Sequence, residues 1–435
     1  MNHATVTLPL STVDGLNHGC YCRTLNPDLL RQQLESDRSL VGLSQNIAQT
    51  RSHLFSSTVV FLTRSMADAI AGTVAAIERV IALPAYQSMA LARAQEIAHL
   101  AFGPAGVFMG YDFHVSPQGP RLIEINTNAG GALLNAALAR AQQACCEAMQ
   151  WAFSPDAGLP ELEQEFCDMF RDEWRLQRGD APMGNMVIVD DAPAAQYLSP
   201  EFELFQQMFR RHGIAATIAD PKELEWRDGR LWCQGNTVGM IYNRLTDFYL
   251  TEPGHQALCQ AYEAGAVVLT PHPHAHAVYA DKRNLVALSD EGLLAAWGVS
   301  ATDRALLSAA VPRTRLVTAE CADELWSQRR QIFFKPVAGY GAKAAYRGDK
   351  LTRRVWDEIR AGDFVAQALV PPDQRLVAVD GVKTDLKFDI RAYTYAGKVQ
   401  LLAARMYAGQ TTNFRTLGGG FAPVVVASKS ESPSC

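Results

Sequence analysis

The feature that most constrains this chain is a pair of strand-like segments, residues 106–116 and 121–127, joined by the sequence Pro-Gln-Gly-Pro. This turn composition predicts a hairpin. Alternate residues of a strand share one face, so Glu124 and Asn126 project together, and strand pairing can bring Asp112 beside them. Carboxylate and amide oxygens are ligands that Mg²⁺ prefers. The hairpin therefore predicts a magnesium site.

The alternative for this hairpin is an ordinary strand pair whose polar residues face solvent. Ile123 and Ile125 alternate with the polar residues and are expected to point into the core. These apolar neighbours, and the glycine pair Gly130-Gly131 that follows, favour the metal site.

A second group of residues is typical of a nucleotide site. The apolar segment Ile332-Phe-Phe-Lys335 ends in a lysine whose ammonium group can bind phosphates. The stretch from Gly339 to Gly348 is predicted to form a glycine flap over the triphosphate between two strands. An ordinary glycine hairpin is the alternative. Residues 339–344 also match the dinucleotide fingerprint, but a strand-like segment follows where that fingerprint requires a helix.

Polar residues near the C-terminus extend the candidate site. Arg391 and Arg415 could each form bidentate hydrogen bonds with a transferring phosphate or a substrate carboxylate. Asn413 could reach a metal ion or a phosphate. A surface position or a structural salt bridge is the alternative for each of the three.

Three histidines, His272, His274 and His276, form a competing pattern. An extended strand would place them on one face, where imidazole nitrogens could bind zinc or another transition metal. Prolines within the segment favour a polar linker beside the nucleotide cleft instead. The sequence leaves metal binding by these histidines open.

Composition limits the class of protein. The chain has 435 residues, is 48% hydrophobic and 20% charged, and carries a net charge of −5. These values indicate a soluble protein with two or three subdomains and argue against a nonspecific nucleic-acid binder. No segment reaches the roughly 18 to 20 apolar residues of a membrane span, and the N-terminus lacks a signal-peptide pattern. We therefore expect a cytoplasmic protein without nucleic-acid or membrane partners.

The chain contains nine cysteines. An odd, scattered set argues against a disulfide framework, so we expect buried reduced thiols. Neither Cys20-Tyr-Cys22 nor Cys145-Cys146 has a second Cys-x-x-Cys pair, and the spacing therefore does not predict a structural zinc site.

Hydrophobic periodicity divides the chain into five parts. Residues 1–104 are predicted to form a helical N-terminal region, and residues 105–180 the hairpin followed by helices, the first of them an alanine-rich helix from Ala132 to Met149. Residues 181–276 have the βαβ rhythm of a small parallel sheet, which we interpret as a substrate-binding α/β domain. Residues 277–427 show an α+β pattern that suits a nucleotide-binding lid and core. The tail 428–435 is polar and is predicted to be disordered.

These blocks resemble the ATP-grasp fold, and their order resembles the circularly permuted form seen in eukaryotic-type glutathione synthetase. The resemblance covers residues 106–426. In the usual order the Glu-x-Asn strand comes last, whereas here it precedes the glycine loop. The matching segments are Leu-Ile-Glu124-Ile-Asn126-Thr-Asn-Ala-Gly-Gly, Val238-Gly-Met-Ile-Tyr-Asn-Arg244, Ala280-Asp-Lys282-Arg-Asn-Leu, Lys335-Pro and Phe364-Val-Ala-Gln367.

The resemblance implies an ATP-grasp fold of mixed α+β and α/β character with an inserted α/β substrate domain. It also implies an ATP-dependent carboxylate–amine ligase that forms an acyl phosphate on small molecules, with Mg²⁺ or alternatively Mn²⁺. The implied ATP-binding residues are Lys282, Lys335, Gly339, Gly341, Lys343 and Gln367. The implied substrate-binding residues are Arg244, Tyr249 and Gly419. The implied catalytic residues are Arg391, Asn413 and Arg415, and the metal ligands are Asp112, Glu124 and Asn126.

Two departures from glutathione synthetases limit what carries over. Gly339 stands where those enzymes have a glutamate metal ligand, so Asp112 is expected to supply the third acidic ligand. Gly110 replaces an arginine that grips their substrate, so a γ-glutamylcysteine substrate does not carry over. An ATP-grasp phosphotransferase and a non-catalytic ATP-binding protein are the alternative functions. The sequence names neither substrate and leaves the oligomeric state open, a homodimer included.

Overall fold

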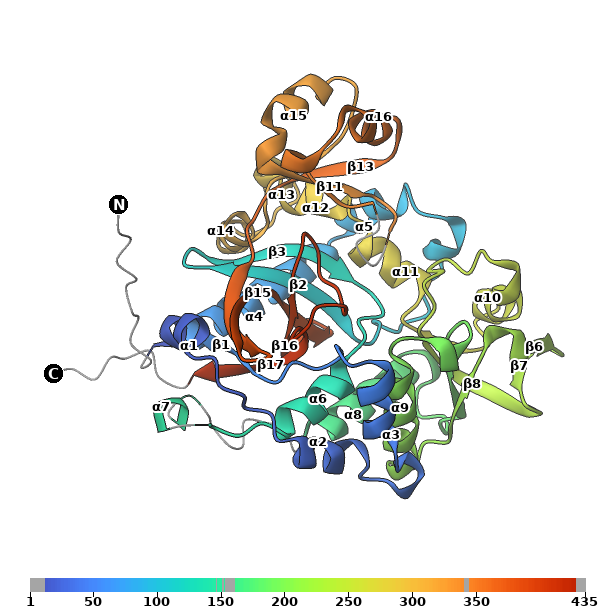
Figure 1. Cartoon of the computed structure of the whole chain (residues 1–435). Helices are drawn as coiled ribbons and strands as arrows, with labels where there is room; N and C mark the ends of the chain where they lie inside the picture. Colours follow the sequence, from blue (N-terminus) through green and yellow to red (C-terminus); the bar gives the residue numbers. More distant parts are fainter. Residues whose placement is uncertain (1–11, 146, 151, 153–160, 340–343, 428–435) are drawn as a thin grey trace, which may run out of the picture.

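The computed structural model describes residues 12–145, 147–150, 152, 161–339 and 344–427. Three β-sheets organise them into a mixed α+β fold, as the sequence predicted (Figure 1). The tail 428–435, for which disorder was predicted, lies outside the described residues.

The largest sheet, here the central sheet, gathers strands from both ends of the chain. Its strands are β1 (Val60–Thr63), β2 (Met109–Ser116), β3 (Gly119–Asn126), β14 (Asp373–Val379), β15 (Val382–Tyr395), β16 (Lys398–Tyr407) and β17 (Gly420–Ala427). Their order is β1-β17-β16-β15-β2-β3, and β14 also pairs with β15. All pairs are antiparallel except β1 and β17. The predicted hairpin is confirmed as β2 and β3. Because β2 also pairs with β15, the hairpin lies beside a strand that is remote in sequence.

A second sheet, here the α/β sheet, is built from strands in the middle of the chain. Its strands are β4 (Asn185–Val189), β5 (Ala216–Ala219), β6 (Leu224–Arg227), β7 (Arg230–Cys233), β8 (Asn236–Asn243) and β9 (Val268–Thr270). The βαβ rhythm is confirmed, because β4 runs parallel to β5 and β8, and β9 runs parallel to β8. β6 and β7 add an antiparallel extension.

A third sheet, which we call the lid sheet, lies at the top of Figure 1. Its strands are β10 (Thr314–Leu316), β11 (Ile332–Pro336), β12 (Tyr346–Arg347) and β13 (Phe364–Ala368), in the order β10-β13-β11-β12. The strand expected after the glycine stretch is present as β12, which pairs antiparallel with β11. Residues 340–343 of the predicted flap, with Gly341 and Lys343, lie outside the described residues.

Helices surround the three sheets (Figure 1). Before residue 105 they are α1 (Val13–Gly19), α2 (Pro27–Leu34), α3 (Leu43–Thr50), α4 (Arg64–Ile81) and α5 (Pro84–Leu91). The middle of the chain has α6 (Ala132–Arg140), α7 (Glu147–Gln150), α8 (Leu162–Arg178), α9 (Ser199–Arg211) and α10 (Gln256–Glu263). Further on are α11 (Pro273–Ala275), α12 (Asn284–Leu288), α13 (Glu291–Ala296), α14 (Ala301–Ala310), α15 (Ala322–Gln328) and α16 (Arg353–Ala361). Among the described helices, none is both long enough and apolar enough to cross a bilayer.

Two local expectations differ from the structure. The N-terminal region is helical but also supplies β1, a four-residue strand too short for its periodicity to stand out from a buried helix. The expected helix from Ala132 to Met149 ends at Arg140 as α6. The chain then pairs with the N-terminal segment, because Gln143 N donates to Thr24 O (2.8 Å) and Asn26 N to Ala141 O (2.9 Å).

One face of the central sheet is the apolar core. Tyr111 and Phe113 of β2 lie opposite Ala392 and Ile390 of β15, and all four side chains are buried. Helices α4 and α14 both contact β3, and their apolar residues belong to the same core cluster. The alternate residues of these strands therefore project from the opposite face.

A β-bulge corrects one detail of the predicted hairpin. Phe113 pairs with Leu122, but Asp112 pairs with Glu124, so Ile123 is the extra residue on β3. A bulge shifts the alternation of side chains by one position. Leu122 and Ile125 are consequently buried in the core, and the expectation that Ile123 points into it is wrong, since Ile123 is partly exposed.

The aromatic packing between α8, α9 and β8 allows a prediction about stability. Phe170 on α8 is fully buried, with ring centroids 4.8 Å from Phe209 and 5.0 Å from Tyr242. We expect Phe170→Ala to lower the free energy of unfolding by about 3 to 5 kcal/mol, since a large cavity replaces the ring. Leu176→Ala on the exposed side of α8 is the control and should change it by less than about 0.5 kcal/mol. Equal losses in urea denaturation would contradict this packing.

Candidate active site

Strand register places a row of polar side chains on the face of the central sheet opposite the core. Glu124 of β3 lies opposite Asp112 of β2, which lies opposite Arg391 of β15. On the next row, Asp389 of β15 lies opposite Arg405 of β16. Directly opposed residues in antiparallel strands share a face, so all five belong to one polar surface.

Asp112 is the centre of this surface and is only 1% exposed. Arg391 donates to it through Nε and Nη2, both at 2.7 Å, and Arg405 Nη2 donates at 2.8 Å. Asn126 Nδ2 donates to Asp112 Oδ2 at 3.0 Å and to Glu124 Oε1 at 3.3 Å. The three predicted metal-type residues are therefore brought together, as the hairpin suggested.

Charge compensation keeps Asp112 ionised. Burial by itself would raise the pKa of this carboxyl, but the charges and hydrogen bonds of Arg391 and Arg405 lower its pKa to about 2. A carboxylate accepts about four hydrogen bonds, and Asp112 already accepts four, three from the arginines and one from Asn126.

Lys335 of the lid sheet reaches this surface from above. It is 4% exposed, and its Nζ donates to Ile123 O at 2.6 Å and to Gln367 Oε1 at 2.8 Å. Ile123 directly precedes Glu124 and belongs to β3, an end strand of the central sheet. Two segments more than 200 residues apart, residues 123 and 335, thus meet at one point.

The ammonium group of Lys335 is partly destabilised there. Burial, together with the charge of Lys282, lowers the pKa of Lys335 to about 8, although Glu124 and Asp112 act in the opposite direction. Lys282 Nζ donates to Gly339 O at 2.7 Å. Lys282, Lys335, Gly339 and Gln367 therefore lie along one border between the lid sheet and β3. Of the other expected ATP residues, Gly341 and Lys343 lie outside the described residues.

Arg244, the predicted substrate arginine, is buried just beyond the end of β8. Its Nη1 donates to the Tyr242 hydroxyl at 3.3 Å, and its Nε has no hydrogen-bond partner among the described residues. A Cβ added at Gly130 would lie 2.7 Å from Arg244 Nη2. Glycine at that position therefore lets the guanidinium approach the chain segment that follows Asn126.

Two acids accompany Arg244. Glu201 of α9 accepts from Gly131 N (2.8 Å) and Leu133 N (3.0 Å) at the start of α6, and burial raises its pKa although Arg244 opposes the shift. Asp190 lies just beyond β4, and burial against the opposing charge of Arg244 raises its pKa to about 7. Glu201 and Asp190 thus both favour the charged form of Arg244, and Asp190 is the one whose pKa lies near neutrality.

The connection between β16 and β17 carries the other predicted catalytic residues. Asn413 Oδ1 accepts from Arg415 N (2.9 Å) and Thr416 Oγ1 (3.0 Å), so its side chain orders its own loop. Arg415 is exposed. Gly419 is buried, and a Cβ there would lie 2.5 Å from Met406 O, so glycine is needed for chain packing. None of these three contacts the Asp112 cluster in the structure.

The histidine alternative fails on its geometry. The segment forms α11 and a π-helical turn, His276–Ala280, and not the extended strand that would align the rings. His272 hydrogen-bonds the Pro104 carbonyl (2.9 Å) and His274 the Ala98 carbonyl (2.8 Å). His276 stacks on Phe248 and lies 5.3 Å from the ring of Tyr249, the remaining predicted substrate residue. Within the described residues the three form no metal-ligand group.

Sequence reasoning missed Arg405, Asp389 and Glu201. Arg405 Nε donates to Asp389 Oδ1 at 2.7 Å, which links the Asp112 cluster to Thr412 through the other oxygen of Asp389. The turn at Gly397 indicates that the strands on either side of it pair, and counting residues back from this turn predicts which ones lie opposite each other. A bulge between Tyr393 and Thr394 shifts that register by one residue, so counting does not place Arg405 opposite Asp389.

Gly110, one of the departures from glutathione synthetases, has a local explanation. A Cβ there would lie 2.7 Å from Ala129 Cβ and 3.3 Å from Arg391 Nε. Both values are too close for an added side chain. The space that a residue 110 side chain would need is filled by Arg391 and the segment after β3.

Comparison with solved structures identifies a fold of known type. A glutathione synthetase-like effector from Globodera pallida, in its apo form, matches with a TM-score of 0.53 and 9% identity, over 94% of this chain and 100% of that one. A putative gamma-glutamylcysteine synthetase from Methylobacillus flagellatus matches with a TM-score of 0.48 and 11% identity, over 86% and 91%. The ATP-grasp ligase PsnB, complexed with minimal precursor, Mg and ADP, has a TM-score of 0.28 and 15% identity, over 55% and 87%.

No family model matches the sequence. No curated protein matches it either. The likeness to the glutathione synthetase-like effector, at 9% identity, concerns the fold alone, and this chain has a mixed α+β fold of that glutathione synthetase-like type.

The burial and pairing of Asp112 allow a prediction about stability at low pH. We expect Asp112→Asn to lower the free energy of unfolding at pH 7 by about 3 to 5 kcal/mol, since the buried Arg391 guanidinium loses its anion and Arg405 keeps only Asp389. The folded-state pKa of about 2 lies below the ordinary value of 3.8, so the stabilisation is present above pH 4 and is lost as pH falls from about 4 to 2. Wild type should therefore lose more stability in that window than Asp112→Asn.

The measurement is urea denaturation at several pH values. Asp172→Asn on α8, whose carboxylate makes a half-exposed ion pair, is the control and should change stability by less than about 1 kcal/mol. Identical acid slopes for wild type and Asp112→Asn would show that Asp112 is not the titrating group.

Proposed function

We propose that this protein is an ATP-dependent ligase that joins a small-molecule carboxylate to an amine through an acyl phosphate. One observation carries the proposal, which is that Lys335 Nζ lies 2.6 Å from Ile123 O, beside the cluster of Asp112, Glu124 and Asn126. A lysine for phosphate and oxygen ligands for a divalent cation are the two parts that a MgATP site needs.

Mg²⁺ fits Glu124 and Asn126 better than it fits Asp112. Glu124 and Asn126 are partly exposed, and both offer oxygen atoms of the kind this ion prefers. The four hydrogen bonds to Asp112 fill its carboxylate, and two of its donors are positively charged. In this proposal Glu124 and Asn126 bind the ion, and Asp112 fixes Arg391 and Arg405. This changes the expectation that Asp112 is the third ligand.

Held by Glu124 and Asn126, Mg²⁺ would supply the positive charge that offsets phosphate charge during transfer. Lys335 and Lys282 would bind the phosphates, since both ammonium groups lie at the border of the lid sheet. Gln367 would remain beside Lys335 on β13, where its buried Nε2 has no partner among the described residues. That free donor suits a nucleotide base at the edge of the lid sheet.

Arg244 would bind the substrate carboxylate, because its guanidinium lies beside the segment after Asn126 with Nε unpaired. A carboxylate oxygen of the substrate attacks the γ-phosphorus of ATP, the bond to ADP breaks, and an acyl phosphate forms. The amine then attacks the acyl carbon, inorganic phosphate leaves, and the amine loses a proton to give the amide. Asp190, whose pKa is raised to about 7 and whose charge interacts with that of Arg244, could take such a proton.

The permuted order of the ATP-grasp blocks is part of the same proposal. The hairpin β2–β3 comes before the lid sheet in sequence but pairs with β15, which comes after it. A phosphotransferase with the same nucleotide site is the second candidate, since an alcohol could replace the carboxylate as acceptor. Amine dependence separates the two.

The first test removes the proposed ligand. We expect Glu124→Gln to lower ADP formation by more than about 100-fold, because even groups that only support a metal ligand change activity about 10- to 100-fold. Substrates come from a thermal-shift screen of wild type with MgATP and pooled amino acids, dipeptides and polyamines, since ligands raise the apparent stability. The control is Glu225→Gln on β6, which should leave ADP formation unchanged.

Product analysis then separates the two reactions. A ligase needs the amine for sustained ADP release, and hydroxylamine in its place should trap the acyl phosphate as a hydroxamate. Undiminished ADP formation by Glu124→Gln would refute the metal role. A phosphorylated acceptor without amide would refute the ligase and favour phosphotransfer.

The pKa of Lys335 predicts how ATP binding depends on pH. Since its pKa is lowered to about 8, the ammonium form that binds phosphate is lost as pH rises above 8. We expect the ATP affinity of wild type to fall between pH 7 and pH 9, and that of Lys335→Arg to stay nearly constant, because a guanidinium stays charged. Calorimetric titration at each pH measures this. Lys350→Arg, an exposed lysine of the lid, should keep the wild-type profile, and a shared profile for all three proteins would exclude Lys335 as the titrating group.

A further inference from the structure

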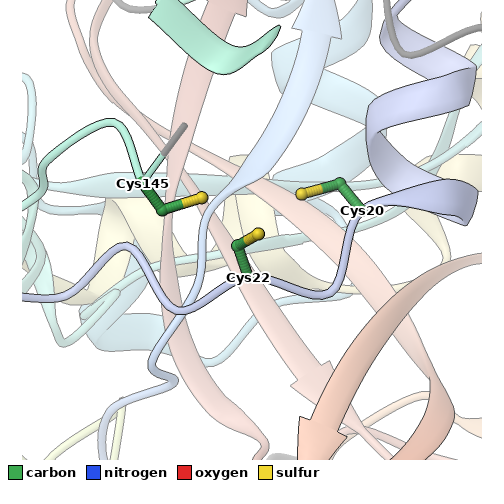
Figure 2. A group of neighbouring side chains, drawn as sticks. All are labelled: Cys20, Cys22 and Cys145. Carbon is green, nitrogen blue, oxygen red and sulfur yellow. The ribbon is translucent and has the colours of Figure 1, made fainter. Parts of the chain in front are cut away.

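Three cysteines that are distant in sequence lie together outside the proposed active site. Figure 2 shows the side chains of Cys20, Cys22 and Cys145 turned toward one another, and their Sγ atoms all lie within 4.8 Å of each other. Cys20 and Cys22 follow α1, and Cys145 lies between α6 and α7.

The main chain fixes the relative position of these segments. Residues 24–26 run beside residues 141–143, with Leu25 and Gln142 forming a β-bridge and Thr24 Oγ1 donating to Gln142 Oε1 at 2.6 Å. The sulfur atoms are thus brought together by backbone and side-chain hydrogen bonds on both segments.

A fourth sulfur atom belongs to the same cluster. Met149 Sδ of α7 is 3.1 Å from Cys145 Sγ and 3.8 Å from Cys20 Sγ, and the Met149 side chain is fully buried. Cys20 is buried, Cys22 is partly exposed and Cys145 is exposed. The group therefore combines a buried sulfur-rich interior with access from solvent.

A buried arginine supplies positive charge beside the cluster. Arg375 of β14 has 0% exposure, and its donors go to backbone carbonyls, including those of Val59 (2.9 Å) and Cys20, and to Thr58 Oγ1 (3.1 Å). Among the described residues it forms no ion pair with a carboxylate. A buried cation is costly unless an anion compensates it, and thiolates are the nearby groups that can do so.

We propose that Cys20, Cys22 and Cys145 bind one Zn²⁺ ion as thiolates, with Met149 Sδ beside the fourth position. Zn²⁺ prefers four ligands in a tetrahedron and binds thiolate sulfur strongly. Three thiolates, one divalent ion and the Arg375 guanidinium sum to zero charge, so the site and the arginine neutralise each other. The ion would tie the segment after α1 to the connection between α6 and α7.

The experiment uses the full chain, stripped with a chelator under reducing conditions and then titrated with Zn²⁺. We expect one zinc ion per chain by elemental analysis and a rise in melting temperature, since an ion that binds the folded state stabilises it. Co²⁺ in place of Zn²⁺ should produce the charge-transfer absorption of thiolate ligands. Cys22→Ser and Cys145→Ser, both at partly or fully exposed positions, should bind zinc more than about 100-fold more weakly than wild type.

The matched control is Cys259→Ser on α10, a half-buried cysteine in another part of the fold. It should keep the wild-type zinc content and absorption. Absence of bound zinc in wild type, or an equal zinc content in Cys145→Ser, would overturn the proposal. So would a disulfide between two of the three cysteines in the native protein, detected by counting thiols after denaturation without reductant. None of these outcomes depends on the ligase proposal.

Discussion

The polar face of the central sheet depends on one buried ionic interaction, the Asp112 carboxylate held between Arg391 and Arg405. Without Asp112, Arg391 would be an uncompensated buried charge and Arg405 would keep only Asp389, and without the arginines the carboxylate would be uncompensated. Because the three residues come from three adjacent strands, β2, β15 and β16, their pairing fixes how the hairpin aligns with the C-terminal strands. Asn126, bonded to the same carboxylate, is aligned with them.

This alignment explains how Lys335 of the lid sheet reaches the Asp112 cluster, although the two are remote in sequence. Lys335 holds Ile123 O at the end strand of the central sheet, and its ammonium lies close enough to Glu124 and Asp112 to be influenced by their charges. A buried lysine with a lowered pKa loses part of its protonation near pH 8, and an arriving phosphate would restore it. The lid sheet and the central sheet are therefore coupled through charge as well as through a hydrogen bond.

Two β-bulges decide which side chains share the polar face. Counting from the β2–β3 turn without a bulge would place Ile123 opposite Asp112, and counting from the turn at Gly397 would place Ala404 opposite Asp389. The bulges move Glu124 and Arg405 into those positions. Because strands alternate with a period of two, a one-residue shift exchanges the two faces entirely. Local sequence does not reveal such a bulge. Glu124 was proposed from its alternation with Asn126 on one strand, which the bulge leaves unchanged, whereas finding Arg405 required the register across two strands.

The sequence by itself determined the mixed α+β fold type, the hairpin with its polar residues, and the strands that carry Lys335 and Gln367, because strand periodicity and turn residues are local signals. Only the tertiary structure decided that Asp112 is filled by two arginines and that β1 joins the central sheet. It also decided that the histidines separate onto different partners, and that Cys145 reaches Cys20 and Cys22. These outcomes depend on register shifts and on contacts between segments more than 100 residues apart, for which spacing along the chain carries no information.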